Sequence, residues 1–521
     1  MTTIEILKKY KIENFSEQGN MITVKVTKDV FTSLATSLAN EENLPLSSLY
    51  ATDDRQVSNT FGVHVLFAND AAHDWLLVST EVLTTEPSYP SLTATVMAAH
   101  WYERYLHDMF GITPLGHPDL RRLVSHENVP ENVYPLRKDF AWNTKMEHAN
   151  VPYPMAHVEG EGIYEIPVGP IHAGIIEPGH FRFNVAGERI ITLEGKLFFT
   201  HKGIEKLVEG KAPLEALPFI ERLSGDMAAG HALAFCQAVE ALAGCEVPKR
   251  AQLLRVLLLE LERVTMHIHD LANIGGMGTG FSFIAANGFR IKERMVRLSD
   301  ELLGNRFWRG EIVPGGVAKD LSTEKLAAIL PVLQAAQVEI NKIVKIALSS
   351  DGFLDRLQTT GVLPLEAAKA FGGVGLPVRA SGFDRDVRRD HPDAVYKELA
   401  VNVQLKTVGD VHARYLCRIN EIDESVRLID AVLKQLTGNS DKNIINECQI
   451  KDGVTIGAVE SWRGEIICAL HFQNGKISRC FPRDPSFCNW ALFAIIGPGN
   501  IVPDFPLCNK SLNLSYSGTD M

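Results

Sequence analysis

The chain has 521 residues, of which 45% are hydrophobic and 22% are charged. These values are ordinary for a folded globular protein, and the length allows about two to four domains. The 52 basic and 63 acidic residues give a formal net charge of −11. Because nucleic-acid-binding proteins carry an excess of positive charge, we expect no nucleic acid partner.

Eight cysteines are scattered between Cys236 and Cys508, and none belongs to a Cys-x-x-Cys pair. This spacing predicts neither a disulfide framework nor a self-contained zinc or iron-sulfur site, and it fits a protein of the reducing cytoplasm. The first residues lack the apolar core of a signal peptide, and no segment approaches the ~20 apolar residues of a membrane-spanning helix. We therefore expect any membrane contact to be indirect, through partner subunits.

Residues 1–140 alternate helix-like and strand-like patterns. The predicted helices are residues 4–10, 30–38 and 93–110, and the predicted strands are residues 21–26, 63–67 and 75–78. An irregular polar stretch punctuated by proline and glycine follows at residues 111–122. We predict that residues 1–140 form a compact α/β domain.

Residues 141–160 contain Pro152 and Pro154 and show little periodicity, which is typical of a linker. Short strands are predicted after it at residues 165–168, 181–185 and 189–193. Predicted helices then follow at residues 248–273, 290–303, 323–347, 364–370, 393–406 and 410–435, with a small β unit at residues 454–479. The predicted fold class is α+β: an N-terminal α/β module followed by a mostly helical bundle domain with small β elements, residues 161–521.

The stretch Glu221–His231 combines a charged pair, a glycine, an acid and a histidine just before an apolar helical segment. It predicts a buried helix with polar groups at its N-terminal end, where backbone donors and a positive helix end gather. The simplest interpretation is that Asp226 caps this helix while Glu221 and Arg222 lie on the surface. A functional site at the helix mouth is the alternative.

Three other polar junctions are open to two interpretations. The loop 169–180 carries His172 and Glu177 among rigid turns, where either binding groups or merely exposed polar residues are found. Residues 379–390 hold four arginines and three aspartates, which form either a surface ion-pair network or bidentate pairs that fix a buried loop. The pair Asp484-Pro485 is first of all a turn signal.

Standard catalytic motifs do not stand out in the sequence. We find no Ser/His/Asp order, no phosphate loop, no His-Glu-x-x-His and no dinucleotide glycine fingerprint, so no NAD site is predicted in this chain. The residues by themselves therefore predict an α/β module joined to a helical bundle, with several polar junctions that could converge.

Taken in chain order, the motifs at these polar junctions resemble those of a known protein family. The region 101–140, with Glu103-Arg104, Asp108 and the run His117–Leu123, resembles the small peripheral subunit of respiratory complex I. From about residue 160 the chain resembles the quinone-site subunit of complex I and its relative, the large subunit of membrane-bound nickel-iron hydrogenases of the formate hydrogenlyase type. The matching stretches are residues 168–182, 201–206, 221–240, 250–267, 379–390, 409–418, 460–465 and 484–489. The fused order of the two modules is characteristic of formate hydrogenlyase large subunits.

Four positions depart from the hydrogenase pattern. In those hydrogenases four cysteine thiolates hold nickel and iron, whereas here the four positions are Ser224, Met227, Ser486 and Asn489. Neutral hydroxyl, thioether and amide groups cannot bridge two metals or supply the negative charge of thiolates. The resemblance thus implies a member that binds no nickel-iron centre and is no active hydrogenase. Because trimming in that family follows nickel insertion, we expect the chain up to Met521 to stay attached.

The resemblance to the quinone-site subunit is also incomplete. The positions of its quinone-binding histidine and tyrosine fall at Ile176 and Gly225, which cannot donate side-chain hydrogen bonds to a quinone carbonyl. Quinone remains possible if it is held differently, with His172, His231 or Asp226 as candidates.

A charged scaffold persists around the expected cavity. Glu177 matches an acid that hydrogenases use for proton movement, and it is a candidate for that role. Further matching residues that would shape the site are Arg222, Arg263, His267, Arg379, Asp384 and Asp484. Buried ionisable groups of this kind could pass protons or switch conformation, because burial and pairing bias their charge states.

Two functions follow from the resemblance. The first is a subunit of a complex I-like, NAD(P)H:quinone oxidoreductase-like complex, passing electrons toward quinone or another acceptor coupled to ion translocation. The alternative is a non-redox scaffold or coupling subunit of an ion-translocating complex. Both imply an iron-sulfur small subunit and antiporter-like membrane subunits as partners, and a peripheral location on the cytoplasmic face of the inner membrane.

Overall fold

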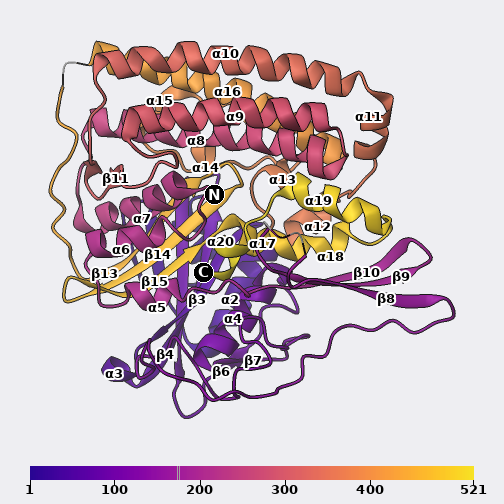
Figure 1. Cartoon of the computed structure of the whole chain (residues 1–521). Coiled ribbons are helices and arrows are strands. Elements are labelled where there is room, and N and C mark those ends of the chain that lie inside the picture. Colours follow the sequence, from indigo (N-terminus) through magenta and orange to yellow (C-terminus); the bar gives the residue numbers. More distant parts are fainter. Residues whose placement is uncertain (173, 175, 440) are drawn as a thin grey trace.

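The computed structural model describes residues 1–172, 174, 176–439 and 441–521. Figure 1 shows an N-terminal α/β part at the bottom, a central three-stranded sheet with the C-terminal helices, and long helices stacked at the top. Helices hold 44% of the residues and strands 18%, in mixed sheets and bundles, which confirms the predicted α+β class.

The N-terminal part is built on one five-stranded sheet with the order β1-β2-β5-β4-β3. Its strands are β1 (Phe15–Gln18), β2 (Met21–Lys25), β3 (Leu46–Asp53), β4 (Thr60–Asn69) and β5 (Asp74–Leu83). Its helices are α1 (Thr3–Lys9), α2 (Lys28–Asn40), α3 (Arg55–Ser58) and α4 (His100–Phe110). A separate parallel pair joins β6 (Ser88–Pro90) to β7 (Thr113–Leu115). The predicted elements are found here, whereas β1, β3, α3, β6 and β7 were not predicted.

The predicted helix 93–110 starts late. The α-helix α4 begins only at His100, after a single 3-10 turn η1 (Met97–Ala99). The buried Glu103 carboxylate accepts hydrogen bonds from the backbone N–H groups of Leu92 at 2.8 Å and Thr93 at 3.2 Å. Because these amides are bound to a side chain, residues 92–95 stay in a turn and do not extend the helix.

Residues 141–162 contain neither a helix nor a strand. They lead into a three-stranded antiparallel sheet with the order β10-β9-β8, formed by β8 (Ile163–Val168), β9 (His180–Ala186) and β10 (Arg189–Lys196). This sheet projects sideways from the molecule (Figure 1). The three strands occur where alternation predicted them.

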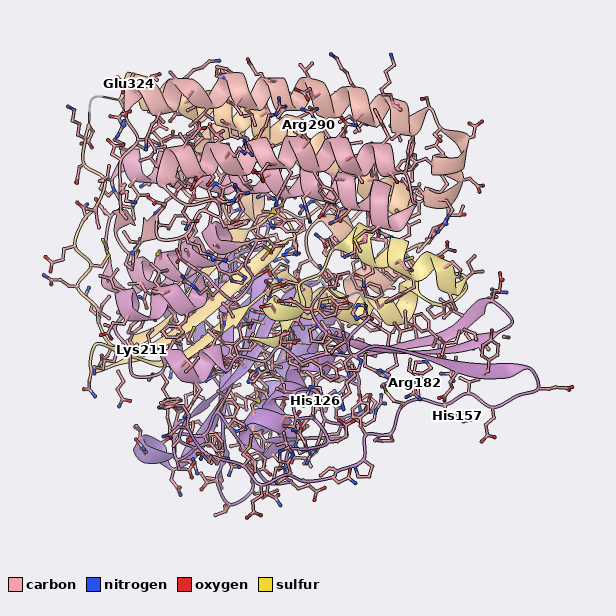
Figure 2. All side chains as sticks on the ribbon, in the orientation of Figure 1. His126, His157, Arg182, Lys211, Arg290 and Glu324 are labelled. Atoms are coloured by element: carbon pink, nitrogen blue, oxygen red, sulfur yellow. The ribbon has the colours of Figure 1, made fainter. Side chains whose placement is uncertain are left out.

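The helical layer is assembled around α8 (Lys249–Asn273), which is buried along nearly its whole length. The other elements in order are α5 (Ile204–Val208), α6 (Pro213–Ile220), α7 (Ala228–Ala243), η2 (Ile274–Gly278), α9 (Ser282–Leu303), β11 (Ile312–Val313), β12 (Gly316–Val317), α10 (Thr323–Leu348), α11 (Asp351–Leu357), α12 (Leu365–Ala370), α13 (Leu376–Arg379), α14 (Val387–Asp390), α15 (Ala394–Leu399) and α16 (Val411–Gly438). Charged side chains such as Arg290 and Glu324 cover the outer face of this layer (Figure 2). Among the described residues, no helix combines the length and apolar character needed to cross a membrane.

The predicted helix 393–406 is shorter than expected. It ends at Leu399 because Ala400 adopts a left-handed conformation with φ of 51°, which terminates the helical hydrogen bonding. Glu424 then fixes the following chain by accepting hydrogen bonds from the backbone and side-chain nitrogens of Asn402 at 2.9 and 3.1 Å.

The central sheet is a meander of β13 (Gly453–Glu460), β14 (Glu465–Gln473) and β15 (Lys476–Arg483). Helix α7 packs across β13 so closely that a Cβ atom at Gly457 would lie 1.9 Å from the Ala234 carbonyl oxygen. The chain finishes with α17 (Pro485–Asn489), η3 (Trp490–Leu492), α18 (Phe493–Ile496), η4 (Val502–Asp504), α19 (Phe505–Leu512) and α20 (Tyr516–Asp520). Figure 1 shows α20 and the C-terminal end in the middle of the molecule.

Buried ionic contacts join the N-terminal part to the rest. Asp70 binds the Nε atom of Arg385 and the Nε2 atom of His391, both at 2.9 Å. The Tyr105 hydroxyl and Arg479 both bind the buried carboxylate of Glu205. These paired charges lock the two parts together, because separating them would leave buried charges without partners.

Candidate functional site

The starts of α7 and α17 face each other in the interior. His231, in the first turn of α7, lies 2.9 Å from the Asp484 carboxylate, and both side chains are buried. The other carboxylate oxygen of Asp484 accepts from the Ser486 N–H at 2.8 Å and so caps α17. Burial alone would raise the pKa of Asp484, but His231 lowers it below its ordinary value. The turn at Asp484-Pro485 therefore also positions the Asp484 carboxylate against His231.

Asp226 is held by an arginine and does not cap α7. Its carboxylate binds Arg463 in a bidentate pair at 2.8 and 2.7 Å and accepts from the Ser224 hydroxyl at 2.8 Å. Although burial opposes ionisation, the charge of Arg463 lowers the pKa of Asp226 to about 2. The N-cap position belongs to Met227, without a side-chain cap, so the capping interpretation of Asp226 is wrong.

The four positions at which the resemblance implies lost cysteines are fully packed. Ser224 is 1% exposed, and Met227, Ser486 and Asn489 are 0% exposed. The Ser515 hydroxyl lies 3.0 Å from that of Ser224, and the Ser515 N–H donates to the Ser486 hydroxyl at 2.9 Å. A residue of the C-terminal segment thus connects two of the four positions.

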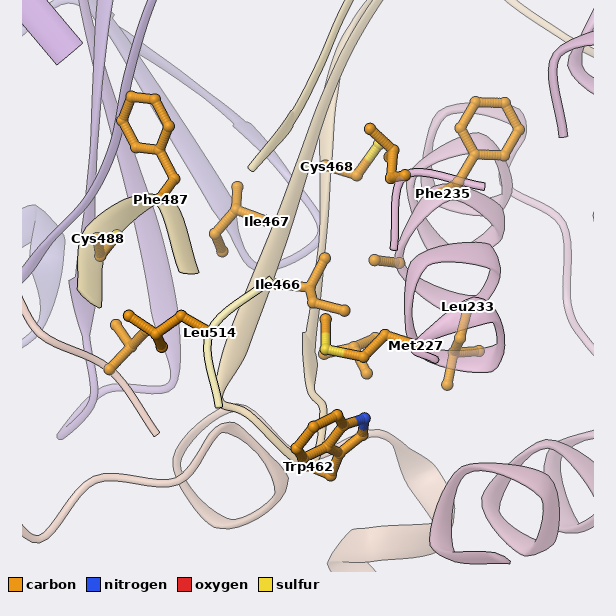
Figure 3. Packing of buried hydrophobic residues seen from close by; sticks show 14 of the residues in the cluster. Met227, Leu233, Phe235, Trp462, Ile466, Ile467, Cys468, Phe487, Cys488 and Leu514 are labelled. Carbon is orange, nitrogen blue, oxygen red and sulfur yellow. The ribbon is translucent and has the colours of Figure 1, made fainter. Parts of the chain in front are cut away.

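The other two positions are bound differently. Asn489 forms a pair of hydrogen bonds with the backbone of Val374, both at 3.0 Å. Met227 extends from the start of α7 toward Ile466 and Trp462, with Leu514 on the opposite side of β14 (Figure 3). The Asn489 amide is therefore occupied by two backbone hydrogen bonds, and the Met227 thioether lies in a hydrophobic cluster. Both side chains have a structural role here.

Residues 514–521, which we call the plug segment, form hydrogen bonds with residues of several polar junctions. The Ser517 N–H donates to Glu177 at 2.8 Å, and the Ser517 hydroxyl donates to the Leu223 carbonyl at 2.8 Å. The Lys202 ammonium donates to the Ser517 carbonyl at 2.8 Å. Three segments that are far apart in the sequence therefore converge on one serine.

Two further residues of the plug segment are tightly bound. A Cβ atom at Gly518 would lie 2.4 Å from the Asp484 carboxylate, so only glycine fits. The Asp520 carboxylate accepts from the N–H groups of Phe198 at 2.8 Å and Thr200 at 2.9 Å. Burial raises the pKa of Asp520 to about 6. The plug segment is thus an integral part of the interior.

The predicted site residues are not all brought together. His172 reaches the plug segment through the Tyr516 hydroxyl at 3.3 Å, in a loop of which residues 173 and 175 lie outside the described part. Arg222 lies apart, with 54% of its side chain exposed, because it follows α6 on the outer face. Asp384 is also 54% exposed and pairs with Arg389 at the surface.

Arg379 belongs to a second buried cluster formed by α8, α13, α16 and β13. Its guanidinium binds Glu421 at 2.9 Å and Glu460 at 2.6 Å, and His267 binds Glu421 at 2.8 Å. Burial raises the pKa of Glu460 to about 7 despite Arg379. The arginine-rich stretch 379–390 is therefore mostly a buried network, with only its Asp384–Arg389 edge at the surface.

Glu262 is a buried carboxyl that sequence reasoning missed. Its oxygens accept from the N–H groups of Ala229 at 2.9 Å and Gly230 at 3.3 Å, at the first turn of α7. Burial raises the pKa of Glu262 from 4.5 to about 8. A charged residue in an otherwise apolar helix signals a buried charge that needs a partner, but the partner itself depends on which helix packs against α8.

Glu262 predicts a pH-dependent stability. Between pH 4.5 and about 8 the folded state holds a proton that the unfolded state has lost. The free energy of unfolding therefore falls as pH rises through this window, by at most about 1.4 kcal/mol per pH unit from this group. Urea unfolding at pH 5 and pH 7.5 should show a weaker fall in Glu262→Gln than in the unsubstituted chain; equal falls would contradict this assignment.

The donor set does not fit a nickel-iron centre. Two hydroxyls, one thioether and one amide stand at the four positions, and hard neutral oxygens do not replace soft anionic thiolates. Within the described ranges, no three or more His, Cys, Asp or Glu residues are arranged to hold a metal ion. The absence of nickel and iron stays a prediction that metal analysis must test.

Other important residues also lacked a sequence signal. Ser515 lies in a stretch without a motif, so its link between Ser224 and Ser486 follows only from the fold. Arg463 lies within a stretch that matched the family, yet its partner Asp226 is 237 residues away in the sequence. The available sequence signal was Asp226 itself, because a buried carboxylate requires a cationic partner such as an arginine.

Family models match three parts of the chain. The respiratory-chain NADH dehydrogenase 30 Kd subunit matches residues 24–146, and the 49 Kd subunit matches residues 278–449. Nickel-dependent hydrogenase matches residues 202–272. The chain therefore joins a 30 Kd-type part to a part related to both the 49 Kd subunit and the hydrogenase large subunit, as the resemblance predicted.

Two curated relatives from Escherichia coli (strain K12) match nearly the whole chain. Formate hydrogenlyase subunit 5 is 34% identical over 513 residues, covering 96% of this chain and 89% of the relative. Hydrogenase-4 component G is 30% identical over 510 residues, covering 96% and 88%. The membrane-bound sulfane sulfur reductase, described as an archaeal respiratory membrane complex, contains a chain with the same fold, at a TM-score of 0.65 and 23% identity over 70% of this chain and 100% of that chain. On these matches, this chain belongs to the family of fused complex I-type and hydrogenase-type large subunits that includes formate hydrogenlyase subunit 5 and hydrogenase-4 component G.

Proposed function

We propose that this chain is the large peripheral subunit of a membrane-associated, complex I-like oxidoreductase complex, and that it works there without a nickel-iron centre. The family supports the first half, since its relatives are named as components of formate hydrogenlyase, hydrogenase-4 and NADH-quinone oxidoreductase. The observation that carries the second half is the burial of Ser224, Met227, Ser486 and Asn489, two of which, Ser224 and Ser486, bind Ser515 of the plug segment.

In this proposal an iron-sulfur small subunit delivers electrons, and antiporter-like membrane subunits couple their transfer to ion translocation. The chain itself would sit on the cytoplasmic face of the inner membrane and contact the membrane through these partners. Quinone is one acceptor, and NAD(P)H would enter the complex through another subunit.

A second candidate is a non-redox coupling or scaffold subunit. The three groups that could bind quinone all have partners inside the protein: His172 contacts Tyr516, His231 contacts Asp484, and Asp226 contacts Arg463. A quinone would therefore have to displace internal hydrogen bonds as well as the plug segment. This observation favours a role in which the old cavity serves as a structural or proton-linked element.

Metal analysis of the natively purified complex tests the proposal. We expect nickel far below one atom per chain, with iron accounted for by the clusters of the small subunit, because no thiolate set is available at the four positions. We also expect the intact mass of the chain to include the residues up to Met521. Stoichiometric nickel would overturn the proposal, and so would a mature chain that ends shortly after Asn489.

Electron transfer separates the two candidates. If the complex reduces quinone, decylubiquinone should reoxidise the reduced iron-sulfur clusters, followed by their electron paramagnetic resonance signal. A non-redox coupling subunit predicts that the signal is unchanged by decylubiquinone, or that the small subunit lacks its cluster cysteines.

A further inference from the structure

A cavity of about 210 Å³ lies at a junction of segments from both parts of the chain. It is formed by α4, the loop 119–123, Tyr153 of the 141–162 stretch, β10, and the η3–α18 turn. Its apolar walls are the aromatic side chains of Trp101, Phe181, Trp490 and Phe493. None of Ser224, Met227, Ser486 and Asn489 lines it, although its wall residue Trp490 also contacts Ser515 and Tyr516 of the plug segment.

The polar wall of this cavity carries more positive than negative charge. Its ionised lining residues are Arg104, Arg121, Arg122, Lys196, Asp119 and Glu194. One arginine, Arg121, occupies both carboxylates, at 2.7 Å from Asp119 and 2.6 Å from Glu194. Of the remaining cations only Arg104 approaches one of these carboxylates, whereas Arg122 and Lys196 depend on backbone groups or on a partner behind the wall.

Arg104 and Arg122 bind mainly backbone carbonyl groups, which carry no compensating charge. Arg104, buried, donates to the Arg121 and Arg122 carbonyls at 2.7 and 3.0 Å and lies 3.8 Å from Asp119. Arg122 donates to the Val129 carbonyl at 2.7 Å. Lys196 pairs with Glu127 at 2.7 Å, behind the wall. Backbone carbonyls satisfy hydrogen bonding without cancelling charge, so the lining groups together with Glu127 carry four positive and three negative charges.

Two neighbouring histidines are consistent with this excess of positive charge. Burial, followed by the charge of Arg104, lowers the pKa of His100 to about 4. Burial, followed by the charge of Lys196, also lowers the pKa of His126. Burial disfavours any unpaired charge here, and only the smaller contributions of Arg104 and Lys196 depend on sign, opposing a further cation.

We propose that this cavity binds a small anion that carries one aromatic ring, of the size of benzoate. A cavity of about 150 Å³ suffices for benzene, so 210 Å³ holds a ring and a carboxylate. The ring packs against Trp101 and Trp490, and the carboxylate faces the guanidinium groups of Arg104 and Arg122. Concave, aromatic sites with a few charged groups at a junction between domains are typical of small-molecule binding.

Tryptophan fluorescence of the full-length chain tests this site, because two of its tryptophans line the cavity. Benzoate should quench the fluorescence saturably, and the neutral isostere benzamide should bind at least about tenfold more weakly, since it cannot form charge-assisted hydrogen bonds. Arg122→Gln should weaken benzoate binding by about tenfold for the same reason.

Two variants keep the test independent of folding defects. Ala494→Trp fills the exposed mouth of the cavity without touching its charges and should abolish saturable quenching. Arg297→Gln, on the outer face of α9 with 69% of its side chain exposed, should leave binding unchanged. Absence of saturable quenching in the unsubstituted chain, equal affinity for benzamide, or binding retained in Ala494→Trp would each overturn the proposal.

Discussion

Replacing Arg379 by methionine is expected to lower the free energy of unfolding by about 3–5 kcal/mol, because it leaves buried carboxylates without their counter-charge. The guanidinium is 0% exposed and binds Glu421 and Glu460 at 2.9 and 2.6 Å, with Asp386 at 3.8 Å. Methionine keeps most of the side-chain volume, so the loss measures charge and hydrogen bonding more than packing. Urea unfolding followed by circular dichroism gives the free energy.

Arg389→Met in the same sequence cluster is the matched control. Arg389 is 36% exposed and pairs with Asp384 and Asp390 near the surface, where water screens the charges. Its loss should cost less than about 1 kcal/mol. If both variants unfold at the same urea concentration, the 379–390 stretch is a surface network and the buried cluster described here is wrong.

Gly518→Ala is expected to destabilise the chain by about 1–3 kcal/mol, the range typical of forcing a methyl group into a filled interior. The added Cβ atom would lie 2.4 Å from the Asp484 carboxylate, which is itself held by His231 and the Ser486 N–H. The Asp484 carboxylate therefore cannot move away from the added methyl group without breaking a buried hydrogen bond. Differential scanning calorimetry of the full-length protein measures the loss as a lower unfolding temperature.

The same substitution in an open place is the control. Gly352 lies in α11, has no atom within 4 Å of its added Cβ, and is not in a left-handed conformation. Gly352→Ala should therefore stabilise the chain by about 0.4–1 kcal/mol, through lower unfolded-state entropy and higher helix propensity. A neutral effect of Gly518→Ala would show that the plug segment does not lie against Asp484 in solution.

The role of the plug segment also bears on the proposed function. In the proposed function, the interior where the resemblance places the metal centre of hydrogenases is closed by the plug segment of the chain itself. Ser515 and Gly518 then take space that a bound group would need. Opening the interior to any ligand would require the simultaneous loss of hydrogen bonds to Glu177, Lys202 and Leu223.

Much of the secondary structure follows from local patterns. The long helix α8 and the meander β13–β15 were predictable because their apolar patterns extend over enough residues to distinguish a helix from a strand. Besides unpredicted elements such as β1 and β3, the errors lie at helix ends: α4 starts after residues whose amides bind Glu103, and α15 stops at the left-handed Ala400, beyond which Glu424 binds the backbone amide of Asn402. Such stops depend on contacts between residues separated in sequence, and no local pattern encodes them.

The sequence by itself determined the residue chemistry at the four positions, because the identity of a side chain fixes whether it can be a soft anionic ligand. It also determined the α+β class and the order of the two modules. Only the tertiary structure decided which charges are buried: within one stretch, Arg379 is enclosed by Glu421 and Glu460 while Asp384 faces water. Only the tertiary structure, too, placed Ser515 between Ser224 and Ser486, because contacts between residues 291 and 29 positions apart arise from packing and not from spacing.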